Sequence, residues 1–275
     1  ETTMNLELRD KVAIVTGGGR GIGKTIATAL AKAGVRVVVA SRNKANLDTV
    51  VDEIGAAGGT ASAFVADISS HNQVREMVSQ TVDSCGGIDL LVNNTGIAGP
   101  TGEVCVVEMD VGARTRAVNL TGAVLCAKEA VRQMKRQKSG NIINISARAG
   151  IHGFYLRNPY AVSKAGLINF TRTLAMEVRK YNLRVNCISP GPVDGQRARS
   201  VIEAKSRALN IPVENIIAEK TAGTALGRFV TEAEVAHVAV FLASPIKGGT
   251  GRSDGYYFLE VKDPKYHGFS LTMLH

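Results

Sequence analysis

The sequence lacks an apolar run long enough to cross a membrane. A membrane-spanning helix needs about 20 consecutive apolar residues, and no run in these 275 residues approaches that length. The first residues also lack the charged region and the apolar region of a signal peptide. We therefore expect a cytoplasmic protein that has no membrane partner.

Cysteine is scarce, and its spacing excludes two common uses. The four cysteines form no C-x-x-C pair and have no histidine cluster nearby; they are Cys85, Cys105, Cys126 and Cys187. This pattern argues against a disulfide framework and against a zinc site. We expect reduced thiols that are mostly buried, and no bound metal.

The net charge of +9 indicates an anionic partner. The basic residues are scattered, however, and no Lys/Arg-rich run with interleaved aromatic residues appears. Such a run would be expected of a nucleic-acid-binding surface, so we do not expect nucleic acid. A phosphorylated cofactor or an acidic acyl substrate would use the same positive charge.

Short β-branched runs alternate with helical patterns along the chain. The runs cover residues 12–15, 35–40, 63–66, 88–92, 140–145 and 183–188, with a weaker one at 256–261. They are apolar nearly throughout, as expected of strands that are covered on both faces. Strands that alternate with helices predict βαβ units with right-handed crossovers. With no repeat or linker in the sequence, we expect one α/β domain over residues 1–275, a doubly wound parallel sheet of about seven strands flanked by helices.

A glycine-rich loop follows the first predicted strand and opens a helix. Glycine is needed there because a side chain would block the sharp turn and hold a pyrophosphate away from the backbone N–H groups. The alternative is a tight turn without a ligand, but the position at the start of the domain favours dinucleotide binding. The predicted contacts are Gly17, Gly19, Arg20, Gly21, Ile22 and Gly23.

The end of the second predicted strand bears on the choice between NAD and NADP. An acidic residue there would bind the ribose 2′-hydroxyl and repel a 2′-phosphate. The sequence has Ser41 at this position, followed by Arg42, and Arg20 lies in the glycine loop. Either arginine alone could be a solvated surface residue. Two arginines with no competing carboxylate favour NADP(H), with NAD(H) as the possible alternative.

Tyr160 and Lys164 are four residues apart, which places them on one face of a helix, one turn apart. A ketone that accepts a hydride also needs a proton donor at its oxygen. A tyrosine hydroxyl can serve if a nearby cation lowers its pKa from about 10. Alone, the Y-x-x-x-K spacing could belong to a surface helix. Pro159 marks a helix start, however, and Ser146 closes the fifth predicted strand.

These motifs resemble the short-chain dehydrogenase/reductase family over residues 11–243, and within it 3-oxoacyl-carrier-protein reductases and related ketone reductases. The resemblance implies a Rossmann fold and catalytic roles for Asn119, Ser146, Tyr160 and Lys164. Ser146 would hydrogen-bond the substrate oxygen, and Asn119 would hold a water in a proton relay. Further cofactor contacts implied by the resemblance are Asp67, Ile68, Asn94, Gly96, Pro190, Gly191 and Val193. Asp67 could alternatively be a helix N-cap, and Asp194 stands where the family usually has threonine.

Two segments are expected to form the substrate pocket. One carries Arg148, His152, Phe154 and Tyr155, although the two aromatic residues could instead belong to the core. The other, about 194–224, corresponds to the family's mobile helical lid. The positive charge around them suggests that Arg148, or the lid residues Arg197 and Arg199, anchors an anionic group of the substrate.

The last thirty residues match the family least well. Residues 249–252 fit its usual turn, but 261–264 only partly fit its usual ending, and a tail follows. The homo-oligomer that the resemblance implies, a tetramer or a dimer, depends on this region. Two other classes remain open from sequence: a dinucleotide-binding sensor without catalysis, and a structural or interaction protein. A ketone panel read at 340 nm would separate the first from an enzyme, and NADPH binding would exclude the second.

Overall fold

The computed structural model describes residues 6–224 and 226–245. Within them, six parallel strands form one sheet in the order β3-β2-β1-β4-β5-β6. Their bounds are β1 Val12–Thr16, β2 Arg36–Ser41, β3 Thr60–Val65, β4 Leu90–Asn93, β5 Gly140–Ile145 and β6 Leu183–Ile188. The seventh predicted strand and the predicted turn at 249–252 lie outside the described residues. The predicted α/β doubly wound sheet is confirmed.

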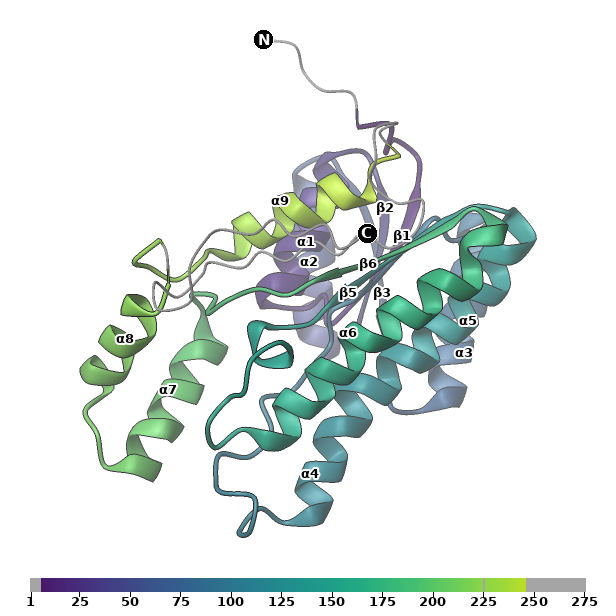
Figure 1. Ribbon diagram of the computed structural model, residues 1–275. Helices are drawn as coiled ribbons and strands as arrows, with labels where there is room; N and C mark the ends of the chain where they lie inside the picture. The colour runs from purple at the N-terminus through teal and green to yellow at the C-terminus, as the bar shows by residue number, and fades with distance from the viewer. Residues whose placement is uncertain (1–5, 225, 246–275) are drawn as a thin grey trace.

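Helices cover both faces of the sheet (Figure 1). Successive residues of β1 are apolar and point to opposite faces of the sheet, so both faces need a cover. Ala13 and Val15 pack in one buried cluster with α1, α2 and α9. Ile14 packs in the other cluster, with α3, α5 and α6. The helices are α1 Gly21–Lys32, α2 Lys44–Ala56, α3 His71–Cys85, α4 Met109–Arg116, α5 Gly122–Gln137, α6 Asn158–Val178, α7 Gln196–Leu209, α8 Val213–Ala222 and α9 Glu232–Ala243.

The strand predictions hold best for β5 and β6. β5 and β6 have the predicted bounds, whereas β3 begins three residues earlier than residue 63. Most of β3 is exposed or half-buried rather than covered on both faces. It lies at the edge of the sheet and pairs with β2 alone. An edge strand faces water, so its side chains need not be apolar.

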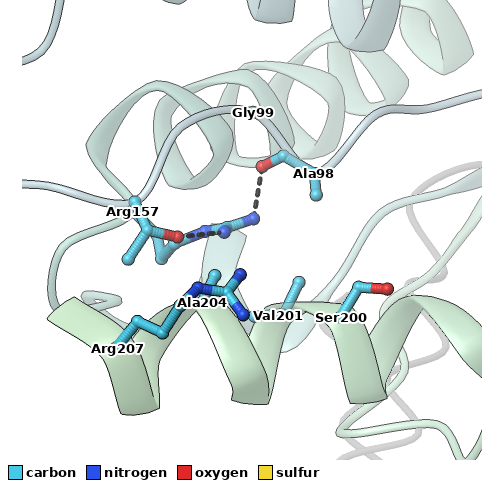
Figure 2. Close-up of a pocket in the computed structure, with 8 residues that line it drawn as sticks. Ala98, Gly99, Arg157, Ser200, Val201, Ala204 and Arg207 are labelled. Carbon is cyan, nitrogen blue, oxygen red and sulfur yellow. Dashed lines mark hydrogen bonds between the residues drawn. The ribbon is translucent and has the colours of Figure 1, made fainter. Parts of the chain in front are cut away.

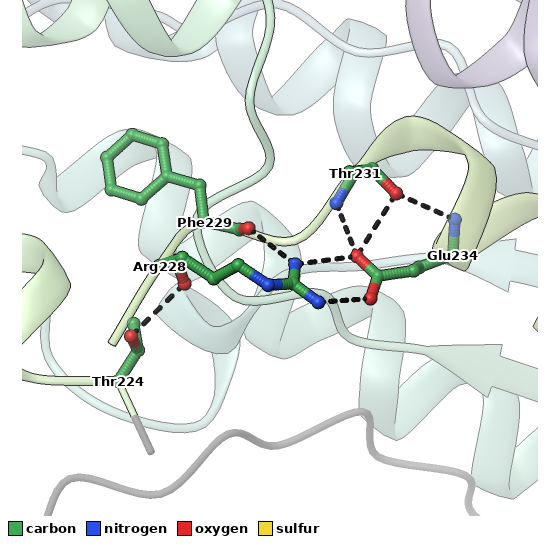
Figure 3. Close-up of polar contacts among 5 residues, drawn as sticks. All are labelled: Thr224, Arg228, Phe229, Thr231 and Glu234. Atoms are coloured by element: carbon green, nitrogen blue, oxygen red, sulfur yellow. Dashed lines mark hydrogen bonds and ion pairs between the residues drawn. The ribbon is translucent and has the colours of Figure 1, made fainter. Parts of the chain in front are cut away.

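The stretch predicted as a lid contains α7 and α8, and it is joined to α9 by a compact polar cluster (Figure 3). Thr231 and Glu234 form a capping box at the start of α9. Arg228 donates to both carboxylate oxygens of Glu234, at 3.0 and 2.7 Å. This ion pair is the largest of the effects that lower the pKa of Glu234 to about 2. The end of the stretch predicted as a lid is hydrogen-bonded to the segment that leads into α9, since the Thr224 hydroxyl donates to the carbonyl oxygen of Arg228 at 3.1 Å.

The four cysteines are all free thiols in the structure. Cys126 and Cys187 are buried, Cys85 is partly buried and Cys105 is exposed, so only half of them fit the prediction of burial. Across residues 6–224 and 226–245, no group of His, Cys, Asp and Glu could hold a metal ion. The same residues contain no helix with the length and apolar character needed to cross a membrane.

Candidate active site

One large cleft runs along the carboxyl ends of the strands, with a volume of about 1660 Å³. The strand order reverses direction between β1 and β4, which is where open α/β sheets bind ligands. Of the residues predicted for the cofactor and the substrate, all but Arg199 line this cleft, and so do Ser146, Tyr160 and Lys164. Asn119 lies beneath it and is fully buried.

The glycine loop between β1 and α1 is shaped by glycines that cannot readily be replaced. Gly17 and Gly21 adopt left-handed φ angles of 65° and 57°, which favour glycine. A Cβ on Gly23 would overlap the carbonyl oxygen of Gly17 and the amide of Asn94. Asn94 holds the loop, since its Nδ2 donates to the carbonyl oxygens of Thr16, at 3.0 Å, and Gly17, at 3.3 Å. The loop and the N-terminus of α1 thus fit a pyrophosphate.

Replacing Gly23 with alanine is expected to weaken NADPH binding at least tenfold and to lower the free energy of unfolding by about 1–3 kcal/mol, since the added methyl must displace the loop. Gly55→Ala is the matched control, because a Cβ there meets nothing within 4 Å. That change should stabilise α2 slightly, by up to about 1 kcal/mol. Fluorescence titration and urea unfolding measure both effects. Unchanged NADPH affinity in Gly23→Ala would refute this account of the loop.

At the end of the cleft where the cofactor ribose is expected, the structure contradicts one premise of the sequence analysis. Arg42 was expected to have no competing carboxylate, but its Nη1 lies 3.8 Å from Oδ2 of Asp67. Asp67 also accepts hydrogen bonds from Ser69, which, as the largest cause, lower the pKa of its carboxyl. Arg20 is exposed and forms no ion pair with another described residue. Sequence could not show the pairing, because Arg42 and Asp67 follow different strands.

Ser146 and Lys164 hold the end of β5 against α6. The Ser146 hydroxyl donates to the carbonyl oxygen of Lys164 at 2.8 Å, and Lys164 Nζ donates to the carbonyl oxygen of Ile145 at 2.8 Å. α6 begins at Asn158 with Pro159 in its first turn, as predicted, and presents Tyr160 and Lys164 to the cleft. The Ser146 hydroxyl has one proton, and this proton is already donated to Lys164. The hydroxyl must therefore rotate before it can donate to a substrate oxygen.

Asn119 lies in a short π-helical turn, Ala117–Thr121, between α4 and α5, rather than inside a regular helix. Its amide both accepts from the N–H of Ile97, at 2.7 Å, and donates to the carbonyl oxygen of Ile97, at 3.0 Å. It also donates to Ser163, one turn from Tyr160. π-Helical turns occur frequently at functional sites. Asn119 therefore fixes the loop after β4 beside the helix that carries Tyr160.

The electrostatic surroundings of Tyr160 differ from the prediction. Burial raises the pKa of its hydroxyl, and the guanidinium groups of Arg197 and Arg157 oppose that rise. The guanidinium carbon of Arg157 lies 5.7 Å from the centre of the tyrosine ring, and Lys164 Nζ lies 5.9 Å away. The cations that lower the pKa of Tyr160 are thus two arginines, whereas Lys164 was expected to do so.

Lys164 is almost fully buried, with only 3% of its surface exposed. Burial, followed by the positive charge of Arg197, lowers its pKa to about 7. Its ammonium group therefore carries a full charge only part of the time at neutral pH. This explains why Lys164 is a weaker source of positive charge for the tyrosine than its position in the sequence suggests.

Helix α7, in the stretch predicted as a lid, contacts the loop that packs against two of the predicted catalytic residues. Nη2 of Arg197, in α7, donates to the carbonyl oxygen of Gly96 at 2.7 Å. A Cβ on Gly96 would lie 3.3 Å from Oδ1 of Asn119 and 3.6 Å from Lys164 Nζ, so this glycine sits against both. Asp194, the unusual acidic residue, lies 3.7 Å from Nη2 of Arg199. Its charge thus has a cationic partner at the edge of the cleft.

Arg157 was not predicted for the site. It is buried, donates to Oγ1 of Thr101 at 2.8 Å and also to the carbonyl oxygen of Ala98. Figure 2 shows it above a small cavity of about 300 Å³ between the 98–101 loop and α7, with Arg207 on the opposite wall. Among the described residues, its Nε has no hydrogen-bond partner. The sequence signal that could have identified Arg157 is its position two residues before Pro159, at the start of the predicted helix.

Four other charged residues at the cleft were also missed: Lys205, Glu219, Lys220 and Glu232. Lys205 and Lys220, from α7 and α8, line its substrate end, and Glu232 lines the end near α1. Thr25 donates to Glu232 at 3.1 Å, so a carboxylate stands beside the glycine loop. All four lie on elements far along the chain from the motifs, and no local pattern distinguishes them from surface charges.

A fold with this strand order, this glycine loop and a tyrosine–lysine pair beside a serine defines a dinucleotide-dependent oxidoreductase. The short chain dehydrogenase model matches residues 11–206, and the chain belongs to that family. A 3-oxoacyl-acyl-carrier-protein reductase, FabG of Thermotoga maritima, is 36% identical over 241 residues, covering 87% of this chain and 92% of that protein.

Two solved structures show the same fold. The structure of NAD⁺-bound xylitol dehydrogenase has a TM-score of 0.88 at 28% identity and covers 93% of this chain and 99% of that one. That of actinorhodin polyketide ketoreductase with NADPH has a TM-score of 0.86 at 31% identity and covers 91% and 96%. The similar proteins thus include one structure with NAD⁺ and one with NADPH.

Proposed function

We propose that this protein is an NADP(H)-dependent oxidoreductase that interconverts a ketone, or a 3-oxoacyl group, and a secondary alcohol. The observation that carries the proposal is the placement of Ser146, Tyr160 and Lys164 in the same cleft as the glycine loop. The ketoreductase names among similar proteins support it. We also propose a single domain, with residues 194–224 as a lid over the substrate.

The glycine loop and Lys164 would hold a nicotinamide cofactor, which when bound would supply or accept the hydride. Tyr160 donates a proton to the ketone oxygen during reduction and accepts it back during oxidation. Because burial raises the pKa of Tyr160, the hydroxyl stays protonated at neutral pH, as reduction requires. Ser146 turns from the carbonyl oxygen of Lys164 toward the substrate oxygen and holds it against Tyr160.

Lys164 and Asn119 support this proton transfer. Lys164 has two further N–H donors besides the one bound to Ile145, and these suit the hydroxyls of the nicotinamide ribose. With its pKa at about 7, the lysine can pass a proton in either direction near neutrality. Asn119 keeps the loop after β4 in place, and we propose that it also holds the relay water.

The direct test is a spectrophotometric screen of NADPH consumption at 340 nm against acyl thioesters, sugar-derived ketones, steroids and keto acids. At least one class is expected to be reduced. A protein that binds NADPH but reduces none of them would instead be the dinucleotide-binding sensor. A protein that binds neither NADPH nor NADH would contradict both functions.

The cofactor preference gives a separate prediction. Wild-type kcat/KM is expected to be at least about tenfold higher with NADPH than with NADH, since one charge-assisted hydrogen bond to a phosphate contributes roughly 1.5–3 kcal/mol. Replacing Arg20 and Arg42 together with glutamine should lower the value for NADPH far more than that for NADH. Arg75→Gln, exposed on α3, is the control and should change neither. Equal use of both cofactors by the wild type would overturn the preference.

A further inference from the structure

Three basic residues from three separate elements meet at the substrate end of the cleft. Arg148 comes from the short 3₁₀ turn after β5 (Arg148–Gly150), Lys205 from α7 and Lys220 from α8. We call them the lid cation cluster. Because they converge from segments up to 72 positions apart, the fold itself brings these charges together on one wall.

The lid cation cluster is only partly neutralised. Lys205 is 3.1 Å from Glu219, whose own side chain is 67% exposed. Lys220 and Arg148 form no ion pair with any residue of the described part of the chain; Arg148 donates to the carbonyl oxygen of Gly223 at 3.2 Å. One solvated carboxylate thus faces three cations.

Lys220 is the member of the lid cation cluster that the excess of positive charge affects most. Its Nζ lies 4.9 Å from the centre of the Phe154 ring, which forms the apolar wall beside it. Burial is the largest cause that lowers the pKa of Lys220; Lys205, Arg157 and Arg148 lower it too, while Glu219 raises it. A folded protein that holds a partly desolvated lysine among like charges gains free energy when an anion arrives there.

We propose that the lid cation cluster is the subsite for an anionic group on the substrate, so that the protein reduces ketones that carry a carboxylate or a phosphate. This inference rests on the proposed function, since it assigns the substrate class of the same cleft. Lys220 binds the anion, Arg148 and Lys205 contribute their charges, and Phe154 contacts the carbon chain between the anion and the ketone.

The test compares each anionic ketone with its neutral counterpart. Acetoacetate, levulinate and longer homologues are measured beside their methyl esters, and dihydroxyacetone phosphate beside dihydroxyacetone, all with NADPH at 340 nm. At least one anion is expected to have a kcat/KM roughly tenfold or more above its counterpart. A preference among carboxylates alone, or for the phosphate alone, identifies which anion the cluster accepts.

Variants then locate the effect. Lys220→Gln should lower kcat/KM for the preferred anion roughly tenfold more than for its neutral counterpart, mainly through KM, and Lys220→Arg should retain the preference. Lys135→Gln is the matched control, because Lys135 also lies over an aromatic ring, that of Tyr181 at 4.5 Å, but outside the cleft. Equal turnover of anionic and neutral ketones by the wild type, or an unchanged preference in Lys220→Gln, would overturn the inference.

A failure of the proposed function gives a different result. If no ketone is reduced, calorimetric titration of the NADP⁺-saturated protein with levulinate and with methyl levulinate still tests the subsite. Tighter binding of levulinate that is lost in Lys220→Gln supports the anion subsite in a non-catalytic protein. Equal binding, or no binding of either, refutes it.

Discussion

Tyr160→Phe is expected to reduce kcat for ketone reduction by at least about a thousandfold, which is within the range for removing a general acid. The substitution removes one oxygen atom and leaves the ring in place. The ring contacts with Arg157 and Lys164 therefore persist, and the glycine loop is untouched. NADPH should bind with a dissociation constant within about threefold of the wild-type value, so the loss belongs to the proton transfer.

Stopped-flow absorbance at 340 nm measures the chemical step, and fluorescence titration measures NADPH binding. Tyr181→Phe is the matched control, since Tyr181 lies against Lys135 and Lys180 and does not line the cleft. Its kcat should stay at the wild-type value. Retention of more than about a tenth of the activity by Tyr160→Phe would remove the tyrosine as proton donor.

Lys164→Met is expected to make the protein more stable and inactive at the same time. Lowering the pKa of a lysine from 10.5 to about 7 corresponds to a cost of roughly 5 kcal/mol for the charged form. Methionine removes that cost and forfeits the hydrogen bond to Ile145, which contributes about 1 kcal/mol. At pH 7.5 about 4 kcal/mol of this cost applies, because the folded lysine has already lost most of its charge, so we expect a net gain of roughly 3 kcal/mol in the free energy of unfolding.

The pH dependence of stability gives the same prediction a second readout. Between pH 7 and 10.5 the unfolded chain holds the lysine proton and the folded protein does not, so the wild-type free energy of unfolding rises with pH in this window. Below about pH 7 both states hold the proton, and this contribution stops changing. Lys164→Met should lack the rise.

Urea unfolding from pH 6 to pH 9 measures this difference, with Lys128→Met as the control, because Lys128 is exposed on α5. Lys128→Met should follow the wild-type curve. The prediction is wrong if Lys164→Met is less stable than the wild type at pH 7.5, or if its free energy of unfolding shows the same rise with pH. Either result would mean that burial does not lower the pKa of Lys164 as described.

Local patterns were sufficient for much of the fold and for the position of the site. The glycine loop, the start of α6 at Pro159 and the strands β5 and β6 depend on short-range preferences that a sequence displays directly. The edge strand β3 was less predictable, because its exposure depends on which strands pair with it. The π-helical turn at Asn119 was also not visible, since it depends on how α4 and α5 are joined over the loop that contains Ile97.

The charges around the site were the least predictable part. The pairing of Arg42 with Asp67 and the burial of Arg157 against Thr101 join segments that are distant in sequence, and Lys205 meets Lys220 across two helices. Each of these residues looks like a solvated surface charge in its local context. A single sequence gives residue types and spacing, but the sign and strength of an electrostatic effect depend on distances that only the folded chain defines.

The hydrogen bond from Arg197 to Gly96 couples access to acid strength. Arg197 lowers the pKa of both Tyr160 and Lys164, yet it belongs to α7 in the lid. If α7 were displaced from Gly96, this positive charge would leave and water would reach both side chains. The pKa of Lys164 would then rise, because burial and Arg197 both lower it. For Tyr160 the two changes oppose each other, because burial raises its pKa and Arg197 lowers it. The position of α7 would thus set the protonation of the lysine more than that of the tyrosine.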